Sequence, residues 1–144
     1  MKIGIANDHR GVKLKEKIAN YLHSRGISCV NYGTDTEDSV DYVDYAEKLC
    51  KAVISEEVNL GILICGTGIG MSIAANKIKG IRCGRVVNAK EAALTKEHNM
   101  ANIIALPEDV ENFEEIVDAF LETKYSDDER HIRRVNKIKK LEEA

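Results

Sequence analysis

One cysteine stands between an apolar run and a glycine-rich stretch, and this arrangement could do chemistry. The run Leu60–Ile64 is short, apolar and bounded by turn residues, which predicts a buried strand that ends at Cys65. Three glycines at alternate positions come next: Gly66, Gly68 and Gly70. A helix is expected to begin at Ile69, and a thiol near a helix N-terminus is more easily deprotonated. We therefore expect Cys65 to be a base or nucleophile, with the hydroxyl of Thr67 close by.

The glycines also predict a place for an anion, because their backbone N–H groups can closely approach a phosphate or a developing oxyanion. The pattern is not the dinucleotide-binding fingerprint, since it follows the third expected strand and no clear acidic residue ends the next one. It is not a Walker loop either, since no Gly-Lys-Ser/Thr follows. Taken alone, the glycine pattern is as typical of a simple turn as of a binding loop.

A second polar cluster follows the first expected strand. It contains Asp8, His9 and Arg10, which would lie at the ligand-facing edge of an open α/β sheet. The alternative is structural: Asp8 could cap the next helix while His9 and Arg10 are solvated. Tyr42 comes just after the loop that follows the second expected strand, where a lone tyrosine usually packs.

Two further clusters lie in the second half of the chain. His98 and Asn99 end an expected helix, where a histidine could be an acid–base group or could simply be favoured by the helix dipole. Arg130 and Arg134 are four residues apart, so both guanidinium groups could reach one phosphate from the same helix face. The alternative is a solvated basic helix end.

Composition narrows the function classes. The chain has 144 residues, 44% of them apolar and 31% charged, with a formal net charge of −3. This acidic total argues against nucleic acid or an acidic membrane as the main partner, and no apolar run reaches the roughly 20 residues that a bilayer span needs. The four cysteines have no metal-like spacing, and the N-terminus has no signal-peptide layout. We expect a cytoplasmic protein.

The elements that must position these residues alternate along the chain. Strands are expected over residues 2–6, 27–31, 60–64, 81–87 and 102–106. Helices are expected over residues 12–24, 42–55, 69–77, 89–97, 110–123 and 127–141. This alternation is typical of βαβ units. It predicts one α/β domain over residues 1–144, a Rossmann-like doubly wound sheet of about five parallel strands in an α/β/α sandwich.

Taken together, the clusters resemble the type B ribose-5-phosphate isomerases, in the wider family that includes galactose-6-phosphate isomerase subunits. The resemblance covers nearly the whole chain, and the stretch from Gly61 to Gly70 is its most specific part. The other marks, in chain order, are Asp8-His9, Asp41-Tyr42, Asp44-Tyr45-Ala46, Ser72-Ile73-Ala74-Ala75-Asn76-Lys77, His98-Asn99, Asn102, Arg130-His131 and Arg134-Val135.

The resemblance implies metal-free aldose–ketose isomerisation through a cis-enediol, by a homodimer or a dimer of dimers. Cys65 matches the family's base and His98 the residue that helps to open the sugar ring. The remaining positions match hydroxyl, enediolate, polar or phosphate contacts: Asp8, His9, Thr67, the amides that follow Gly66, Asn99, Arg130 and Arg134. The His98 and Asn99 positions come from across the dimer interface in the family.

The chain departs from the family's pattern at three places. Arg10 replaces a usually small residue, Val43 replaces a common proline, and Pro107-Glu108-Asp109 replaces a Gly-x-Arg turn whose arginine would reach the phosphate. We hypothesise that Arg10 partly compensates for that arginine. The leading interpretation is the interconversion of D-ribose 5-phosphate and D-ribulose 5-phosphate. A hexose 6-phosphate isomerase of the allose or galactose type and a non-catalytic sugar-phosphate sensor remain as alternatives.

Overall fold

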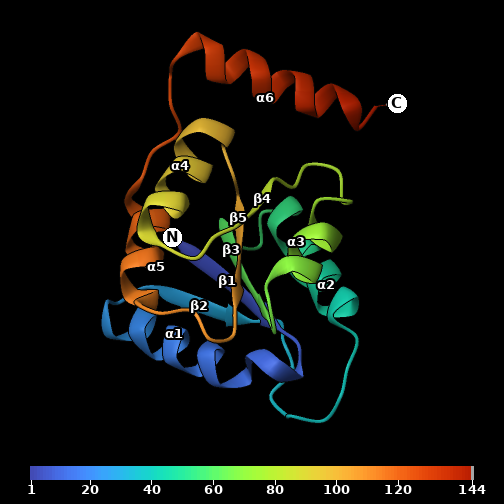
Figure 1. Cartoon of the computed structure of the whole chain (residues 1–144), viewed down its shortest axis with the longest axis vertical. Helices are drawn as coiled ribbons and strands as arrows, with labels where there is room; N and C mark the ends of the chain where they lie inside the picture. The colour runs from blue at the N-terminus through green and yellow to red at the C-terminus, as the bar shows by residue number, and fades with distance from the viewer. Residues whose placement is uncertain (144) are drawn as a thin grey trace.

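The computed structural model describes residues 1–143 and has a five-stranded parallel sheet in the order β2-β1-β3-β5-β4 (Figure 1). The strands are β1 (Lys2–Asn7), β2 (Ser28–Asn31), β3 (Leu60–Cys65), β4 (Cys83–Arg85) and β5 (Ile103–Pro107). The prediction of a Rossmann-like α/β fold with about five parallel strands is confirmed.

Helices cover both faces of the sheet (Figure 1). They are α1 (Val12–Ser24), α2 (Tyr42–Ile54), α3 (Ile69–Ala75), α4 (Ala89–Asn99), α5 (Phe113–Glu122) and α6 (Glu129–Leu141), with a 3-10 turn, η1 (His9–Gly11), before α1. The helices α1, α4 and α5 pack on one face, and α2 and α3 pack on the other.

The strand sequences explain this arrangement. All six residues of β3 are buried, as expected for a strand covered on both faces. Because side chains alternate along a strand, Ile62 and Ile64 enter the core under α1 and α5, while Leu63 and Cys65 enter the core under α2 and α3. The thiol is therefore on the α2–α3 face, at the carboxyl end of its strand.

The order of strands also creates a topological switch point. The chain passes from β1 to β2 in one direction, whereas β3 lies on the other side of β1. In open α/β sheets, ligands bind outside the carboxyl ends of the strands at such a switch point. The residues after β1 and those after β3 flank this point.

The C-terminal helix α6 stands apart from the sheet, beyond the end of α4 (Figure 1). Val135 is its one buried residue, and three large apolar side chains are exposed: Ile132, Ile138 and Leu141. Within residues 1–143, no helix is both long enough and apolar enough to cross a membrane.

Two expected elements differ most from the observed ones, while the others agree to within two residues at each end. The strand expected over residues 81–87 is confined to Cys83–Arg85, because Ile81 is buried in a turn after α3 and its burial does not come from the sheet. The helix expected from residue 110 begins at Phe113, because Asn112 has a left-handed backbone with φ 56° that a helix cannot continue through.

Candidate active site at the carboxyl edge

The Cys65 sulfur lies inside a tight loop between β3 and α3. Cys65 is 5% exposed, and the backbone N–H of Gly68 donates to its sulfur at 3.2 Å. Gly68 adopts the left-handed conformation, with φ 76°, and a Cβ there would come within 2.9 Å of the Leu106 carbonyl carbon. Glycine is thus required twice, for its dihedral angle and for its close approach to β5. The Gly68 N–H is thus a hydrogen-bond donor directed at the sulfur.

Thr67 forms the exposed tip of the same loop. Its Oγ1 accepts a hydrogen bond from the Ile69 N–H at 3.2 Å, which occupies one of the free donors of the first turn of α3. The first helical bond runs from Ser72 N–H to the Gly68 carbonyl. The N–H of Gly70 precedes that bond and is therefore among the free donors of the first turn.

Arg10 covers the loop from the β1 side. Its Nε donates to the Glu108 carboxylate at 2.7 Å, and this partner raises the pKa of the guanidinium further. A Cβ added to Gly66 would come within 3.2 Å of the Arg10 Nη1, so the guanidinium lies against the Gly66 backbone. Arg10 therefore brings a positive charge to the loop, but part of that charge is balanced by Glu108.

Asp8 and His9 occupy the other side of the switch point. The Asp8 carboxylate is buried and accepts a hydrogen bond from the Arg10 N–H at 3.0 Å, so it caps the η1 turn. The His9 Nδ1 accepts from the Val40 N–H at 3.2 Å. A ring nitrogen that accepts a hydrogen bond carries no proton, so Nε2 of the neutral ring is the donor.

Tyr42 lies directly on the glycine loop. A Cβ at Gly70 would meet the Tyr42 ring carbon Cζ at 2.8 Å, so the ring packs against the Gly70 backbone. Both residues line a hollow of about 340 Å³ between α2 and α3. The sequence thus brings Asp8, His9, Arg10 and Tyr42 to the Cys65 loop.

The remaining predicted site residues lie at the opposite edge of the sheet. The helix α4 runs back along the strands, so His98 and Asn99 are at the amino edge, where β5 begins. The His98 ring stacks on His131 of α6, with centroids 4.1 Å apart and an interplanar angle of 9°.

Arg130 and Arg134 are exposed on α6 beyond that stack. Arg130 pairs with the Asp128 carboxylate at 2.8 Å, and this guanidinium holds the pKa of Asp128 far below its usual range. Within one chain, neither arginine lies at the Cys65 edge.

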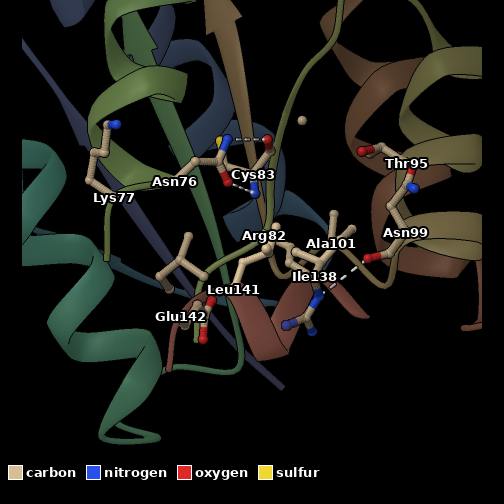
Figure 2. A pocket seen from close by; sticks show the side chains of 12 residues that line it. Asn76, Lys77, Arg82, Cys83, Thr95, Asn99, Ala101, Ile138, Leu141 and Glu142 are labelled. Carbon is tan, nitrogen blue, oxygen red and sulfur yellow. Dashed lines mark hydrogen bonds between the residues drawn. The ribbon is translucent and has the colours of Figure 1, made fainter. Parts of the chain in front are cut away.

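A hollow of about 610 Å³ opens at the amino edge between α3, β4, α4 and α6. Figure 2 shows Asn99 on its wall, where the Asn99 carbonyl accepts a hydrogen bond from the Arg82 guanidinium. On the other wall, the Asn76 side chain is bonded to the backbone of Cys83 in both directions, at 2.9 and 2.8 Å (Figure 2). These bonds fix the end of α3 to the edge strand β4 and so keep the hollow open.

Two contacts at the Cys65 loop were not predicted from the sequence. Arg85 donates from Nε to the Thr67 carbonyl at 2.9 Å, and Glu108 holds Arg10. An isolated arginine on a short edge strand belongs to no motif, so only its place at the carboxyl end of β4 could have suggested a role. Glu108 is notable in the sequence only as part of Pro107-Glu108-Asp109, which gives no sign that it pairs with Arg10.

Across residues 1–143, no group of three or more His, Cys, Asp or Glu side chains is placed to hold a metal ion. The four cysteines are unpaired. The fold and the site define an α/β protein with a buried thiol and a loop of backbone N–H donors at the carboxyl edge of its sheet.

Comparison with known proteins identifies the family. Residues 3–138 match the family model described as Ribose/Galactose Isomerase. The chain is 41% identical to Ribose-5-phosphate isomerase B of Escherichia coli (strain K12) over 145 residues, which is 99% of this chain and 97% of that protein.

Two solved structures have the same fold. Ribose-5-Phosphate Isomerase B of Clostridium thermocellum superposes with a TM-score of 0.95 at 46% identity, covering 99% of this chain and 98% of that one. Ribose-5-phosphate Isomerase B of Mycoplasma genitalium, solved with bound Ribulose-5-phosphate, has a TM-score of 0.91 at 37% identity and covers 99% and 96%. The chain belongs to the ribose/galactose isomerase family.

Proposed function

We propose that this chain is an aldose–ketose isomerase that interconverts D-ribose 5-phosphate and D-ribulose 5-phosphate without a metal or other cofactor. The observation that carries the proposal is the Cys65 sulfur at the switch point, with the Gly68 N–H directed at it from 3.2 Å. Membership of the ribose/galactose isomerase family and the ribulose 5-phosphate bound to the Mycoplasma relative support the substrate class.

In the proposed mechanism, the Cys65 thiolate removes the proton from C2 of the open-chain aldose. The C2–H bonding pair forms the C1=C2 double bond of a cis-enediolate, and O1 takes the negative charge. The thiol then returns its proton to C1 while the O2 hydroxyl loses its proton and becomes the ketone, and O1 gains one. A single positioned base typically contributes about 10²–10⁴ in rate to such a step.

The glycine loop supplies a donor for the enediolate. The Gly70 N–H precedes the first helical bond of α3 and is a free donor at the positive end of this helix. The N–H groups of Gly68 and Ile69 already donate to the Cys65 sulfur and to the Thr67 Oγ1. Loss of one such donor typically costs roughly 2.7–4 kcal/mol of transition-state stabilisation. Asp8, Thr67 and Tyr42 are assigned to the sugar hydroxyls, because they surround the loop.

The proposal needs a second copy of the chain. His98, Asn99, Arg130 and Arg134 are at the amino edge, whereas Cys65 is at the carboxyl edge. A homodimer, alone or as part of a dimer of dimers, can bring the amino edge of one copy to the carboxyl edge of its partner. The exposed apolar side chains of α6 support this, because a lone helix with Ile132, Ile138 and Leu141 in water gains stability when a partner covers them.

In this arrangement, His98 acts as the acid that helps to open the furanose ring and Asn99 binds a substrate oxygen. The phosphate lies between His9 Nε2 and the two arginines of the partner's α6. Arg10 adds a further cation in place of the family arginine for which this chain has Asp109. The chain acts as one isomerase domain, and its four free thiols are consistent with the reducing cytoplasm.

The test is an NMR isomerase assay of the purified chain with the phosphates of ribose, allose and galactose. We expect turnover of ribose 5-phosphate, with exchange of the C2 proton. A preference for allose 6-phosphate or galactose 6-phosphate would favour the hexose alternative. Binding without turnover of any of them would favour the sugar-phosphate sensor and contradict the proposal.

A further inference from the structure

Arg85 contacts the opposite side of the same peptide group that contacts the Cys65 sulfur. The Arg85 Nε donates to the Thr67 carbonyl oxygen at 2.9 Å. That carbonyl and the Gly68 N–H belong to one peptide unit, and the N–H donates to the Cys65 sulfur at 3.2 Å. A guanidinium, one peptide group and a thiol are therefore joined by two hydrogen bonds in sequence.

Such a chain of bonds is cooperative. A cation that pulls electron density toward a carbonyl oxygen makes the N–H of the same peptide a better donor. We propose that Arg85 is a positioning residue for the isomerase base: it polarises the Thr67–Gly68 peptide so that the Gly68 N–H stabilises the Cys65 thiolate. This inference rests on the proposed function only for the role of the thiolate, because the hydrogen-bond relay exists independently of any substrate.

The surroundings of Arg85 favour this role over a purely structural one. The residue is exposed and ends the three-residue edge strand β4, so its side chain adds little to the core. None of the carboxylates of residues 1–143 forms an ion pair with it. Its charge is thus not neutralised, in contrast to that of Arg10, which Glu108 balances.

The other charged groups around the loop are few. Arg10 comes from η1, Asp8 from the end of β1 and Glu108, followed by Asp109, from the end of β5. Arg10 acts on the thiolate through space from the Gly66 side. Among these charged groups, Arg85 alone donates a hydrogen bond to the Thr67–Gly68 peptide, whose N–H contacts the Cys65 sulfur. The effect of Arg85 can therefore be separated from that of Arg10, Asp8 and Glu108.

The experiment measures the rate of Cys65 alkylation by iodoacetamide as a function of pH, resolved by peptide mass spectrometry. Burial raises the pKa of the Cys29 thiol, that of Cys50 to about 12, and that of Cys83 still further, so these three sites should react slowly. For Arg85→Gln, we expect the pH of half-maximal alkylation to rise by about 0.5 unit. At any one pH well below this midpoint, the fraction of thiolate should then be roughly threefold smaller than in wild type.

Two variants separate charge from hydrogen bonding. Gln retains an N–H donor for the Thr67 carbonyl but no charge, whereas Arg85→Lys retains the charge, so Lys should restore most of the wild-type profile. Lys17→Gln removes the same charge from an exposed position on α1 and should leave the profile unchanged.

The outcomes test the role of Arg85 and the proposed isomerase function separately. An Arg85→Gln profile that superposes on wild type, or an equal shift in Arg85→Lys, would overturn the relay even if the enzyme isomerises ribose 5-phosphate. A shift restored by Lys in a protein that isomerises no sugar phosphate would support the relay and contradict the proposed function. Thermal unfolding of each variant checks that the fold is intact.

Discussion

The two edges of the sheet carry equally distinctive residues but differ in how completely one chain assembles them. At the carboxyl edge, the loop after β3 is fixed by bonds from its own chain: Gly68 to the Cys65 sulfur, Ile69 to Thr67, and Arg10 to Glu108. At the amino edge, α6 meets α4 through the His98–His131 stack and a bond from Ser126 N–H to the Glu97 carbonyl at 3.0 Å.

This difference places the two halves of the proposed site at opposite edges. The loop that holds Cys65 is pre-organised, as a proton transfer between adjacent carbons requires. The edge with His98, Arg130 and Arg134 lies at the other end of the strands. In the proposed function, one chain therefore holds the base without its acid, and the experiments below test each half separately.

The largest effect is expected at Cys65. Cys65→Ala removes the base, so kcat should fall by about 10²–10⁴ while a phosphate ester still binds, because the phosphate contacts lie elsewhere. Exchange of the C2 proton followed by NMR measures the first effect, and calorimetry with the ester measures the second. Cys29→Ser, at a half-buried thiol of β2, is the control and should retain kcat. Full turnover in Cys65→Ala would remove Cys65 from its role.

The next effect concerns the amino edge. Arg134→Ala should raise KM for ribose 5-phosphate by roughly 10–100-fold, since a charge-assisted hydrogen bond is worth about 1.5–3 kcal/mol. The neighbouring Arg133→Ala removes the same charge from a different side of α6 and should change KM little. Equal effects of the two substitutions would mean that α6 acts by its overall charge and not by a specific contact.

A smaller effect is expected at Arg10, which the structure places against Gly66 and pairs with Glu108. Arg10→Ala should raise KM by several-fold, less than Arg134→Ala, because Glu108 already balances part of the charge. Glu108→Gln is the matched variant: it releases the guanidinium and should lower KM. If Arg10→Ala leaves KM unchanged while Arg134→Ala raises it strongly, Arg10 does not compensate for the arginine that Asp109 replaces.

The smallest effect is a loss of stability expected at Asp35, in the loop whose Val40 N–H donates to His9. The Lys15 ammonium bonds to the Thr34 carbonyl and to Asp35, each at 2.5 Å, and it lowers the pKa of the Asp35 carboxyl. A carboxylate with a depressed folded-state pKa stabilises the fold above its unfolded pKa of about 3.9, and this contribution is lost as the pH falls through the folded value.

Because the Asp35 side chain is 74% exposed, the contribution is small. Asp35→Asn should lower Tm by a few degrees or less at pH 7, and the difference from wild type should shrink as the pH falls below about 3.9. Melting curves from pH 7 down into this acid range measure it. A difference that does not shrink with falling pH would mean that the lost contact is not ionic.

Much of the fold could be predicted from the sequence, because strong hydrophobic patterning and parallel topology leave few alternatives. The helix at residues 12–24 was predicted with its observed bounds. The strand around Ile81 was predicted too long because burial in a turn and burial in a sheet produce the same apolar pattern. The helical spacing of apolar residues extends across Asn112, so it gave no sign that the helix begins only at Phe113. The left-handed backbone of Asn112 cannot be recognised from such spacing.

The candidate site was only half predictable for a physical reason. Residues that follow parallel strands must gather at one edge, so the neighbourhood of Asp8, Cys65 and Tyr42 follows from their order. The opposite placement of His98 follows from the direction of α4. In the proposed function, a surface between two copies would join these residues, and such a surface leaves no local pattern in the sequence of one chain. Arg85 belongs to no sequence motif and to no periodic pattern, so its hydrogen bond to the Thr67 carbonyl could not be predicted from the sequence.

In the proposed homodimer, each active site combines Cys65 of one copy with His98 of the other. It is tested by mixing two inactive variants, Cys65→Ala and His98→Ala, through unfolding and refolding together. If sites are shared, random pairing gives half heterodimers with one intact site each, so activity should recover to about one quarter of wild type. If the refolded mixture contains heterodimers and remains as inactive as the separate variants, each site is built within one chain and the account is wrong.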